Sequence, residues 1–304
     1  MSFSTQDGLE AVRHLCSRAS CRSFSEQPVE DGLLHEILSA ALHAASGGNL
    51  QPWSVIVERD RERAQKLCDL CGGQKFIADA PVNLIFLLDW HRYQIYAAQK
   101  DAPFTCDHSY MHFLIGLEDV MCAAQTVETA CHLVGLGSCY VGSSNHCGAE
   151  LAEMYSLPQL TYPVVILSVG WPKAQPPVAP KLDPSVVIFE GEYPALTPEQ
   201  IYDAYETKLQ GRTLPLPAKE PYRSEMLDTL RRSLLTTFDP ERTEAILKTA
   251  DGQGFINETQ RRFGLHYHAR DMYETGGKIL EMMRLQGLRP FDALEKKGSF
   301  SDEH

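Results

Sequence analysis

The pattern of apolar residues after Pro28 predicts a helix with one buried face. Glu30 and Asp31 suit a helix start, because acidic side chains stabilise the N-terminal turn of a helix. Two glycines, Gly47 and Gly48, follow the end of the pattern. The apolar positions between recur at helical spacing and are Leu33, Leu34, Ile37, Leu38, Ala41 and Leu42.

Three short runs rich in β-branched residues predict buried strands. They are WSVIV (53–57), PVNLIFLLD (81–89) and YPVVILSVG (162–170). The charged run RDRERAQKLCDLC (59–71) lies between the first two and predicts a surface helix. The order of these elements indicates a protein of mixed α and β structure.

A long helix is predicted for residues 112–134, with an apolar stripe that includes Val120, Ala124, Val127 and Cys131. The sequence GLG (135–137) ends this helix, because glycine adopts the left-handed conformation that commonly terminates helices. The strand-like SCYV follows it directly.

The texture of the chain changes at Trp171. The stretch WPKAQPPVAPKLDP is rich in proline and predicts an extended arm, and charged helical patterns follow Pro198. We therefore expect one domain over residues 1–194 and a helical extension over 195–304. Four apolar residues of the extension need burial, and we expect them to pack mainly on a partner subunit: Leu227, Leu230, Leu234 and Leu235.

Composition is that of a globular protein, with 304 residues, 43% hydrophobic and 22% charged. The net charge of −12 makes nucleic acid and anionic membrane surfaces poor partners. No run approaches the roughly 20 apolar residues of a membrane span. Nine scattered cysteines without a secretion signal predict free thiols and a cytoplasmic protein.

Two motifs point to a ligand. In SRASCRSF, the residues Arg18, Ser20 and Arg22 alternate, so an extended segment would direct two cations and a hydroxyl to one side, as binding of an anion requires. A solvated charge cluster is the alternative. The second motif, SGGNLQP (46–52), places glycines, a hydroxyl and an amide between two apolar elements, which is more than a simple turn needs.

Five segments in order resemble the FMN-dependent nitroreductase family: SRASCRSF, AASGGNLQPW, GGQKFIADAPVNLIFLLDWHRY, GLGSCYVGS and VGWPKAQPPVAPKLDPSVVIFEGEY. The second half is especially similar to the type A oxygen-insensitive NADPH nitroreductases and flavin reductases. The resemblance implies an α+β layered fold, with a central, mostly antiparallel sheet flanked by helices. It also implies an intertwined homodimer with FMN between the subunits, and residues 1–194 as the FMN-binding domain.

The resemblance implies a phosphate site and a cation at the flavin ring. By matched position, Arg18 and Ser20 would hold the FMN phosphate, with Lys181 completing the site from the proline-rich arm. Arg22 would face the N1/O2 edge of the flavin, where a cation stabilises the reduced ring. The sequence departs from the family at Ala19, Ala45 and Ala179, which predicts weaker retention of FMN.

The same resemblance implies five further contacts with the flavin ring. Ser46 and Asn49 would reach it from the other chain, and Gln74 would contact its pyrimidine edge. Gly142 and Ser143 would place backbone N–H groups near N5 and O4. Hydride transfer needs no acid or base from the protein, so Arg22, Gly142 and Ser143 are expected to support the flavin and no catalytic residue is assigned.

Other candidate motifs favour structural roles. A metal is not expected at Cys68 and Cys71, at the group Cys106, His108 and His112, or at His266 and His268, because no complete ligand set stands at the needed spacing. Arg212 falls where type A members bind the NADPH 2′-phosphate, but a solvated arginine is the favoured interpretation. Tyr140 and Trp171 are interpreted as core aromatics.

Together these features predict an FMN-dependent oxidoreductase that takes electrons from NADPH or NADH. It would reduce a small-molecule acceptor, namely a nitroaromatic, a quinone or a flavin, by hydride transfer. Two alternatives stay open. One is a relative that uses reduced FMN for enone reduction or dehalogenation, and the other is an FMN-binding or redox-sensing protein that does not turn over.

Overall fold

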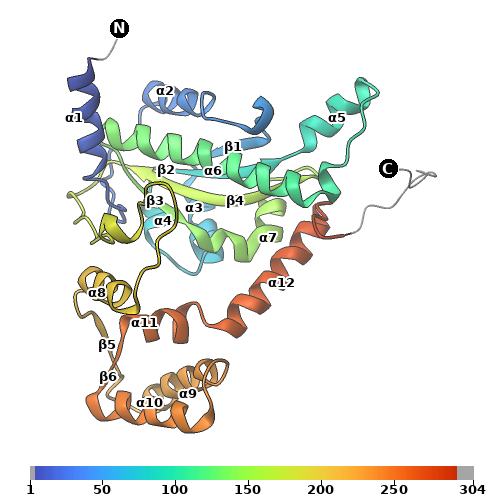
Figure 1. The fold of residues 1–304 in the computed structure, drawn as a ribbon. Helices are drawn as coiled ribbons and strands as arrows, with labels where there is room; N and C mark the ends of the chain where they lie inside the picture. The colour runs from blue at the N-terminus through green and yellow to red at the C-terminus, as the bar shows by residue number, and fades with distance from the viewer. Residues whose placement is uncertain (1–3, 293–304) are drawn as a thin grey trace. The chain divides into compact units, whose positions relative to one another are not determined.

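The computed structural model describes residues 4–292, which form two compact units (Figure 1). The first unit comprises the described residues of Met1–Val178 and Lys278–His304, and the second is Ala179–Gly277. Helices and a small antiparallel sheet make up the first unit, which confirms the α+β class. None of the described helices is long and apolar enough to cross a bilayer.

The sheet of the first unit has four strands in the order β1 (Trp53–Glu58), β2 (Val82–Asp89), β4 (Thr161–Gly170) and β3 (Gly137–Val141). Neighbouring strands are antiparallel throughout. All eight residues of β2 are buried, because helices cover both of its faces. The runs at 53–57, 81–89 and 162–170 are therefore confirmed as strands.

One face of the sheet packs against α2 (Asp31–Ala41) and α6 (Tyr110–Leu133). Leu84 and Phe86 of β2 point to this layer, where they meet Ile37 of α2 and Val127 of α6. The stripe read from the sequence of α6 is thus the face that packs on the sheet. The long helix predicted for residues 112–134 is confirmed within two residues at its start.

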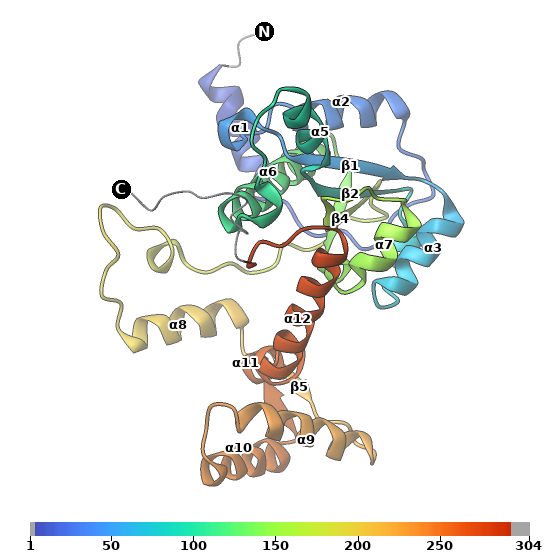
Figure 2. The ribbon, with the colours of Figure 1, turned by 90° about the vertical axis from the view of Figure 1, so that its right-hand side faces the viewer.

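The opposite face packs against α3 (Arg61–Leu70), α4 (Phe76–Asp79) and α7 (Gly148–Met154). Ile85 of β2 points to this layer and lies in one cluster with Leu67 and Leu151. Figure 2 shows α2 on one side of the strands and α3 with α7 on the other. The alternation of side chains along β2 therefore serves two cores at once.

The sequence predicted neither the short helices α4 and α7 nor two further helices of the first unit. These two are α1 (Thr5–Leu15), whose start is closed by a capping box between Ser4 and Asp7, and α5 (His91–Gln99). Neither buries a residue in this chain. Leu9, Val12 and Leu15 of α1 nevertheless recur at helical spacing, so its stripe was readable from the sequence, whereas the periodicity of α5 is weak.

The C-terminal end of α12 (Ala269–Leu285) belongs to the first unit. Met283 and Leu288 are buried in the core beside the sheet, and the backbone N–H of Leu160 donates to the Gln286 carbonyl at 2.7 Å. The units therefore differ from the division expected at residue 194. The change of composition at the proline-rich arm corresponds to a change of local structure. The boundaries of the two units are set instead by which residues pack together.

The second unit has its own small core. Leu227, Leu230 and Leu234 pack there, so their burial requires no partner subunit, whereas Leu235 is 47% exposed. The proline-rich arm has no regular element before a short 3₁₀ turn at Pro184–Val186, as the sequence predicted. The elements that follow are α8 (Pro198–Leu209), β5 (Thr213–Pro215), α9 (Tyr222–Leu234), α10 (Pro240–Gln253), β6 (Phe255–Asn257), α11 (Glu258–Arg261) and a π-helix at Arg262–His266.

A buried carboxylate fastens the turn from β6 into α11 and the π-helix. Glu258 accepts hydrogen bonds from Arg261 at 2.7 Å through each of its oxygens, and from Arg262 Nε at 2.8 Å. Its side chain is only 8% exposed. The two guanidinium groups lower the pKa of Glu258 from 4.5 to about 2.

Glu258→Gln is expected to lower the free energy of unfolding by about 1–3 kcal/mol, because charge-assisted hydrogen bonds to a buried carboxylate are lost. The folded carboxyl has the lower pKa, so its contribution is complete above pH 5 and is lost as the pH falls towards 2. Denaturant unfolding at pH 7 and pH 3 measures both effects. Glu244→Gln is the matched control, because its pair with Arg231 is exposed; equal losses in the two variants would contradict the role of Glu258.

Candidate functional site

The segment from Arg18 to Arg22 runs along the start of β3. Ser20 forms a parallel bridge with Ser138, and the backbone N–H of Cys21 donates to the Ser138 carbonyl at 2.8 Å. A Cβ on Gly137 would lie 2.6 Å from the Cys21 Cβ, so glycine is what lets the two backbones approach. The segment is thus held alongside β3, as the argument from the alternation requires.

Arg18 and Ser20 lie together, and Arg22 stands slightly apart. The Arg18 Nη1 atom is 3.5 Å from the Ser20 hydroxyl. The exposed Arg22 guanidinium lies 5.8 Å from the centre of the Phe76 ring, which begins α4. Among residues 4–292 no carboxylate forms an ion pair with Arg22, so its charge is available to a ligand.

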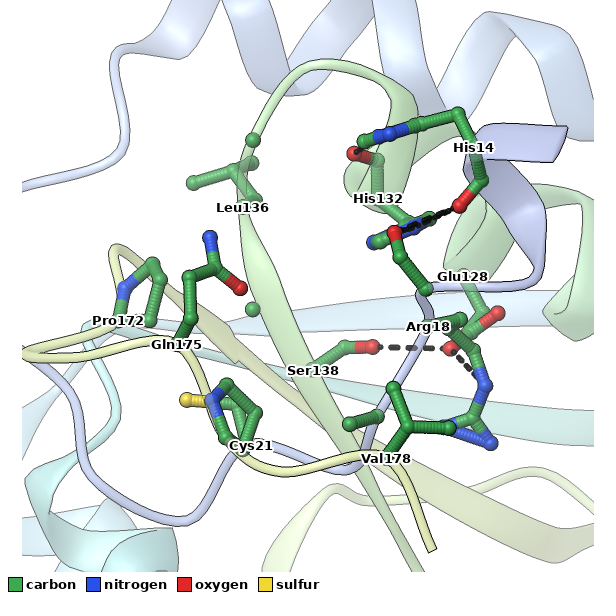
Figure 3. A pocket seen from close by; sticks show the side chains of 15 residues that line it. His14, Arg18, Cys21, Glu128, His132, Leu136, Ser138, Pro172, Gln175 and Val178 are labelled. Atoms are coloured by element: carbon green, nitrogen blue, oxygen red, sulfur yellow. Dashed lines mark hydrogen bonds and ion pairs between the residues drawn. The ribbon is translucent and has the colours of Figure 1, made fainter. Parts of the chain in front are cut away.

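A buried acid that the sequence did not single out holds Arg18. The Glu128 carboxylate is 3.3 Å from Arg18 Nε and accepts hydrogen bonds from Gln125 at 2.8 Å and from the Ser138 hydroxyl at 3.4 Å. Figure 3 shows Arg18 and Ser138 reaching this carboxylate together. The sequence did contain a signal for this role, because Glu128 lies between Val127 and Cys131 of the apolar stripe. A carboxylate that is buried with such a stripe needs a partner. Anchoring at Nε leaves the outer nitrogens of Arg18 for another acceptor.

A cavity of about 360 Å³ opens beside this ion pair within the first unit (Figure 3). The imidazoles of His14 and His132 stack on its wall with ring centres 4.4 Å apart. Each Nε2 lies near the backbone oxygen of the other histidine, at 3.3 and 3.1 Å, which ties α1 to α6. Gln175, from the start of the proline-rich arm, lines the opposite side.

Gln74 and Ser143 converge on a single backbone carbonyl. Gln74 Nε2 donates to Ser143 Oγ at 3.0 Å and to the Cys71 carbonyl at 3.1 Å, and Ser143 Oγ donates to the same carbonyl at 3.0 Å. Ser143 lies in the 3₁₀ segment Gly142–Cys147 that follows β3. A Cβ on Gly142 would meet nothing within 4 Å, so one side of this backbone is open.

The SGGNLQP loop is fastened to the middle of α6. The Ser46 hydroxyl donates to Asp119 at 2.8 Å and accepts from the Gln51 N–H at 2.7 Å, and the Gly47 N–H donates to Asp119 at 2.9 Å. Gly48 and Asn49 adopt positive φ angles of 57° and 56°. The exposed Asn49 side chain therefore stands on a rigid turn, while Ser46 is already engaged within its own chain.

The expected ligand residues form two separate groups. Arg18 and Ser20 are linked to Glu128, whereas Ser46 is linked to Asp119. These two acids are nine residues apart on α6, which corresponds to about 13 Å along the axis and half a turn around it. One chain thus does not bring the two groups together. Lys181 is exposed and belongs to the second unit.

The remaining candidates have structural contacts. Cys68 and Cys71 are buried beside the sheet, His108 pairs with Asp107 at 2.9 Å, and Trp171 donates to the Pro28 carbonyl at 3.2 Å. Within the part of the chain that the structure describes, no group of three or more His, Cys, Asp or Glu side chains is arranged to hold a metal. Other outcomes are that Tyr140 packs against the core, His112 stands edge-on to Trp90, and Arg212 and His266 are exposed.

The fold is that of an α+β protein, and Arg18, Ser20 and Arg22 form a candidate anion site alongside β3. The model of the Nitroreductase family matches residues 15–171, so the chain belongs to that family, as the five motifs indicated. The chain is 29% identical to an oxygen-insensitive NADPH nitroreductase of Salmonella typhimurium, over 74% of this chain and 90% of the relative. It is 31% identical to an FMN reductase [NAD(P)H] of Bacillus subtilis, over 60% of this chain and 74% of the relative.

A solved structure described as NfrA2 of B. megaterium superposes with a TM-score of 0.70 and 25% identity. The match covers 92% of this chain and 98% of the other. Most of the second unit must therefore have a counterpart in that structure. The nitroreductase-like fold expected from the motifs is confirmed.

Arg18→Ala is expected to lower the free energy of unfolding by about 1–3 kcal/mol, because it leaves the buried Glu128 charge without its cation. Adding Glu128→Gln should recover most of this loss, since a neutral amide needs no cation. Denaturant unfolding of the wild type, both single variants and the double variant gives the coupling as a double-mutant cycle. A coupling energy near zero would show that the ion pair does not hold this segment.

Proposed function

We propose that this chain is an FMN-dependent NAD(P)H oxidoreductase that reduces nitroaromatics, quinones or flavins by two-electron transfer. The observation that carries the proposal is the placement of Arg18, Ser20 and Arg22 alongside β3, and of the Gln74–Ser143 pair just after its end, in a nitroreductase fold. FMN, when bound, supplies the hydride acceptor and donor. The residues of the chain bind it, orient it and stabilise its charge.

The phosphate end of the site fits the first motif. Glu128 fixes Arg18 through Nε, and the outer guanidinium nitrogens and the Ser20 hydroxyl form a donor set for a phosphate. Lys181 is proposed to join this set from the proline-rich arm. The proposed set would gather cations of an otherwise acidic protein around one anion.

The ring end of the site fits the second group of residues. Arg22 carries the charge proposed to face the N1/O2 edge, and a cation there favours the reduced ring. Gln74 is proposed at the pyrimidine edge. The open backbone at Gly142 and its neighbour Ser143 are proposed to donate near N5 and O4, so the chain orients the reacting atom without an acid or base of its own.

We propose that the protein is a homodimer with Ser46 and Asn49 serving the flavin of the partner subunit. Their separation from Arg18 along α6 supports this arrangement, because one chain supplies only part of each site. An apolar groove between α2 and α6 supports it too, since large exposed apolar patches mark interfaces. The groove is lined by Ala40, Ala45, Met121, Ala130 and Leu133, among others.

The extension over residues 195–304 is proposed to pack on the dimer. Its aromatic side chains support this, because several remain more than half exposed in the single chain, namely Tyr202, Tyr222, Phe263 and Tyr273. The proposed compartment is the cytoplasm. All nine cysteines are free in the structure, which suits a reducing environment.

Apoprotein titrated with FMN should quench the flavin fluorescence, and the loaded protein should oxidise NADPH continuously when a quinone is added. A protein that only binds FMN would be reduced once and stop. Arg22→Ala should weaken FMN binding by about 1.5–3 kcal/mol, the range for a hydrogen bond to a charged group, and should slow reduction by NADPH. Stability should change little, because Arg22 is exposed.

Arg22→Lys is the matched control, because it keeps the charge while removing the guanidinium. It should retain most of the reduction rate if charge at N1/O2 is what matters. An unchanged flavin spectrum on addition of FMN to wild-type protein would overturn the proposed function. Wild-type affinity and rate in Arg22→Ala would remove Arg22 from the site.

Met121→Glu is expected to raise the dissociation constant of the dimer at least about tenfold, or 1.4 kcal/mol, because it places a charge in the apolar groove. FMN retention should fall with it, since binding and assembly are linked. Sedimentation of loaded and apo protein measures both. Val57→Glu on β1 is the control with the same exposed fraction, 39%; an FMN-loaded monomer of the wild type would contradict the dimer.

A further inference from the structure

The second unit contains a cavity of about 490 Å³ that is separate from the residues of the proposed flavin site. The cavity lies between the C-terminal end of α9, α10, α11 and the π-helix, all within this unit. Its volume falls in the range of ~300–1,000 Å³ that is typical of pockets for small molecules. Five large apolar side chains line it, namely Leu230, Leu234, Phe238, Ile246 and Phe263.

The π-helix forms a wall of this cavity and is fixed to α9. Gly264 lies so close to α9 that a Cβ at this position would collide with Leu230. The Ser233 hydroxyl donates to the Gly264 carbonyl at 2.7 Å. The Tyr267 N–H donates to the Arg262 carbonyl at 2.6 Å, which is the five-residue spacing of a π-helix. Hydrogen-bonded backbone therefore holds this wall in place.

A capping box at the start of α11 supplies two amide side chains to the lining. Asn257 Oδ1 accepts from the Gln260 N–H at 2.8 Å, and Gln260 Oε1 accepts from the Asn257 N–H at 3.0 Å. Both amide oxygens are thus engaged, whereas neither amide nitrogen has an acceptor within residues 4–292. Each nitrogen carries two N–H groups. The capping box therefore offers a ligand donors and no amide acceptor.

The rest of the lining selects an uncharged, aromatic ligand. Among the described residues, those that line the cavity include no Asp, Glu, Lys or Arg. An ionised ligand would lose its hydration there without gaining an opposite charge. Phe263 and Tyr267 present aromatic rings to the cavity, and Phe263 is 68% exposed. A planar ring packed on Phe263 would remove apolar surface of both partners from water.

We propose that this cavity binds an uncharged aromatic carbonyl compound, whose ring packs on Phe263 and whose oxygen accepts a hydrogen bond from the Gln260 amide. A carbonyl oxygen has no proton to donate, so it matches a pair of amides that have only donors left. A peptide segment would bring N–H groups of its own, for which the capping box has no amide oxygen free. The proposal is independent of the proposed function, because no residue of the lining is a proposed flavin contact.

The probe is prodan, an uncharged naphthalene with a carbonyl group, whose emission shifts to the blue in apolar surroundings. Titration into the full-length protein should give a saturable blue shift. Gln260→Glu should raise the Kd at least about tenfold, because it replaces the amide donor with an acceptor. Its melting temperature should not fall, since glutamate also closes a capping box. Gln200→Glu is the matched control in the capping box of α8 and should leave the Kd unchanged.

A second probe isolates the hydrogen bond. The same aminonaphthalene without its acyl group should bind the wild type more weakly than prodan does, and should bind Gln260→Glu as it binds the wild type. The comparison of the two probes in the wild type does not depend on the folding of any variant. Thr237→Trp, at an exposed position of the lining, should weaken both probes because the indole fills the cavity.

The remaining outcomes overturn the proposal. Absence of saturable binding to the wild type shows that the cavity takes no such ligand. An unchanged Kd in both Gln260→Glu and Thr237→Trp places the probe elsewhere on the protein. Equal weakening of the two probes by Gln260→Glu removes the hydrogen bond to the carbonyl. If the variants instead change the sedimentation of a wild type that binds no probe, a second copy of the chain covers the cavity.

Discussion

Burial of β2 and β4 on both faces is the constraint on which the rest of the first unit depends. Because consecutive side chains of β2 enter different cores, a slip of one residue would exchange Ile85 with Phe86 and disrupt both layers together. The register of the sheet is therefore tightly specified. Apart from Lys181, which lies in the second unit, the segments of the proposed site are attached to this frame through β3, through the turn after α3, or through α6.

Two buried acids on α6 connect the sheet and its helices to the two loops of the proposed site. Asp119 fastens the Ser46–Gly47 backbone, and Glu128 fastens Arg18. A buried carboxylate is costly unless it is paired, so each acid enforces the conformation of the loop that satisfies it. The helix that covers the sheet thus also sets the positions of both loops that the motifs had singled out.

The sequence predicted those features that have a long or strong periodic signal. The three apolar strands and the helix over residues 112–134 were found because each is buried along a continuous stripe or run. Helices α1 and α5 and the paired strands β5 and β6 were not found, because the helices bury no residue in this chain and each strand has only three residues. The return of Met283 to the first core is a contact across more than a hundred residues, which no local pattern contains.

The sequence identified the motifs of the candidate site but not the contacts that their residues make. The alternation of Arg18, Ser20 and Arg22 directs them to one side only if the segment is extended, and the pairing with β3 meets this condition. Glu128 and Asp119 escaped attention because their partners are distant in sequence, at Arg18 and Ser46. The hydrogen bond from Ser46 to Asp119 was likewise not predictable, because it depends on the tertiary packing of the loop against α6.

The second unit is an insertion and not a tail, because the chain leaves the first unit at Val178 and re-enters it at Lys278. Removal of everything after the proline-rich arm would also take away Met283 and Leu288, and with them part of the core beside the sheet. The insertion is joined to the first unit at two points, after Val178 and before Lys278. The core that α2 and α6 form with the sheet, together with the closing segment of α12, is therefore built from residues on both sides of the insertion.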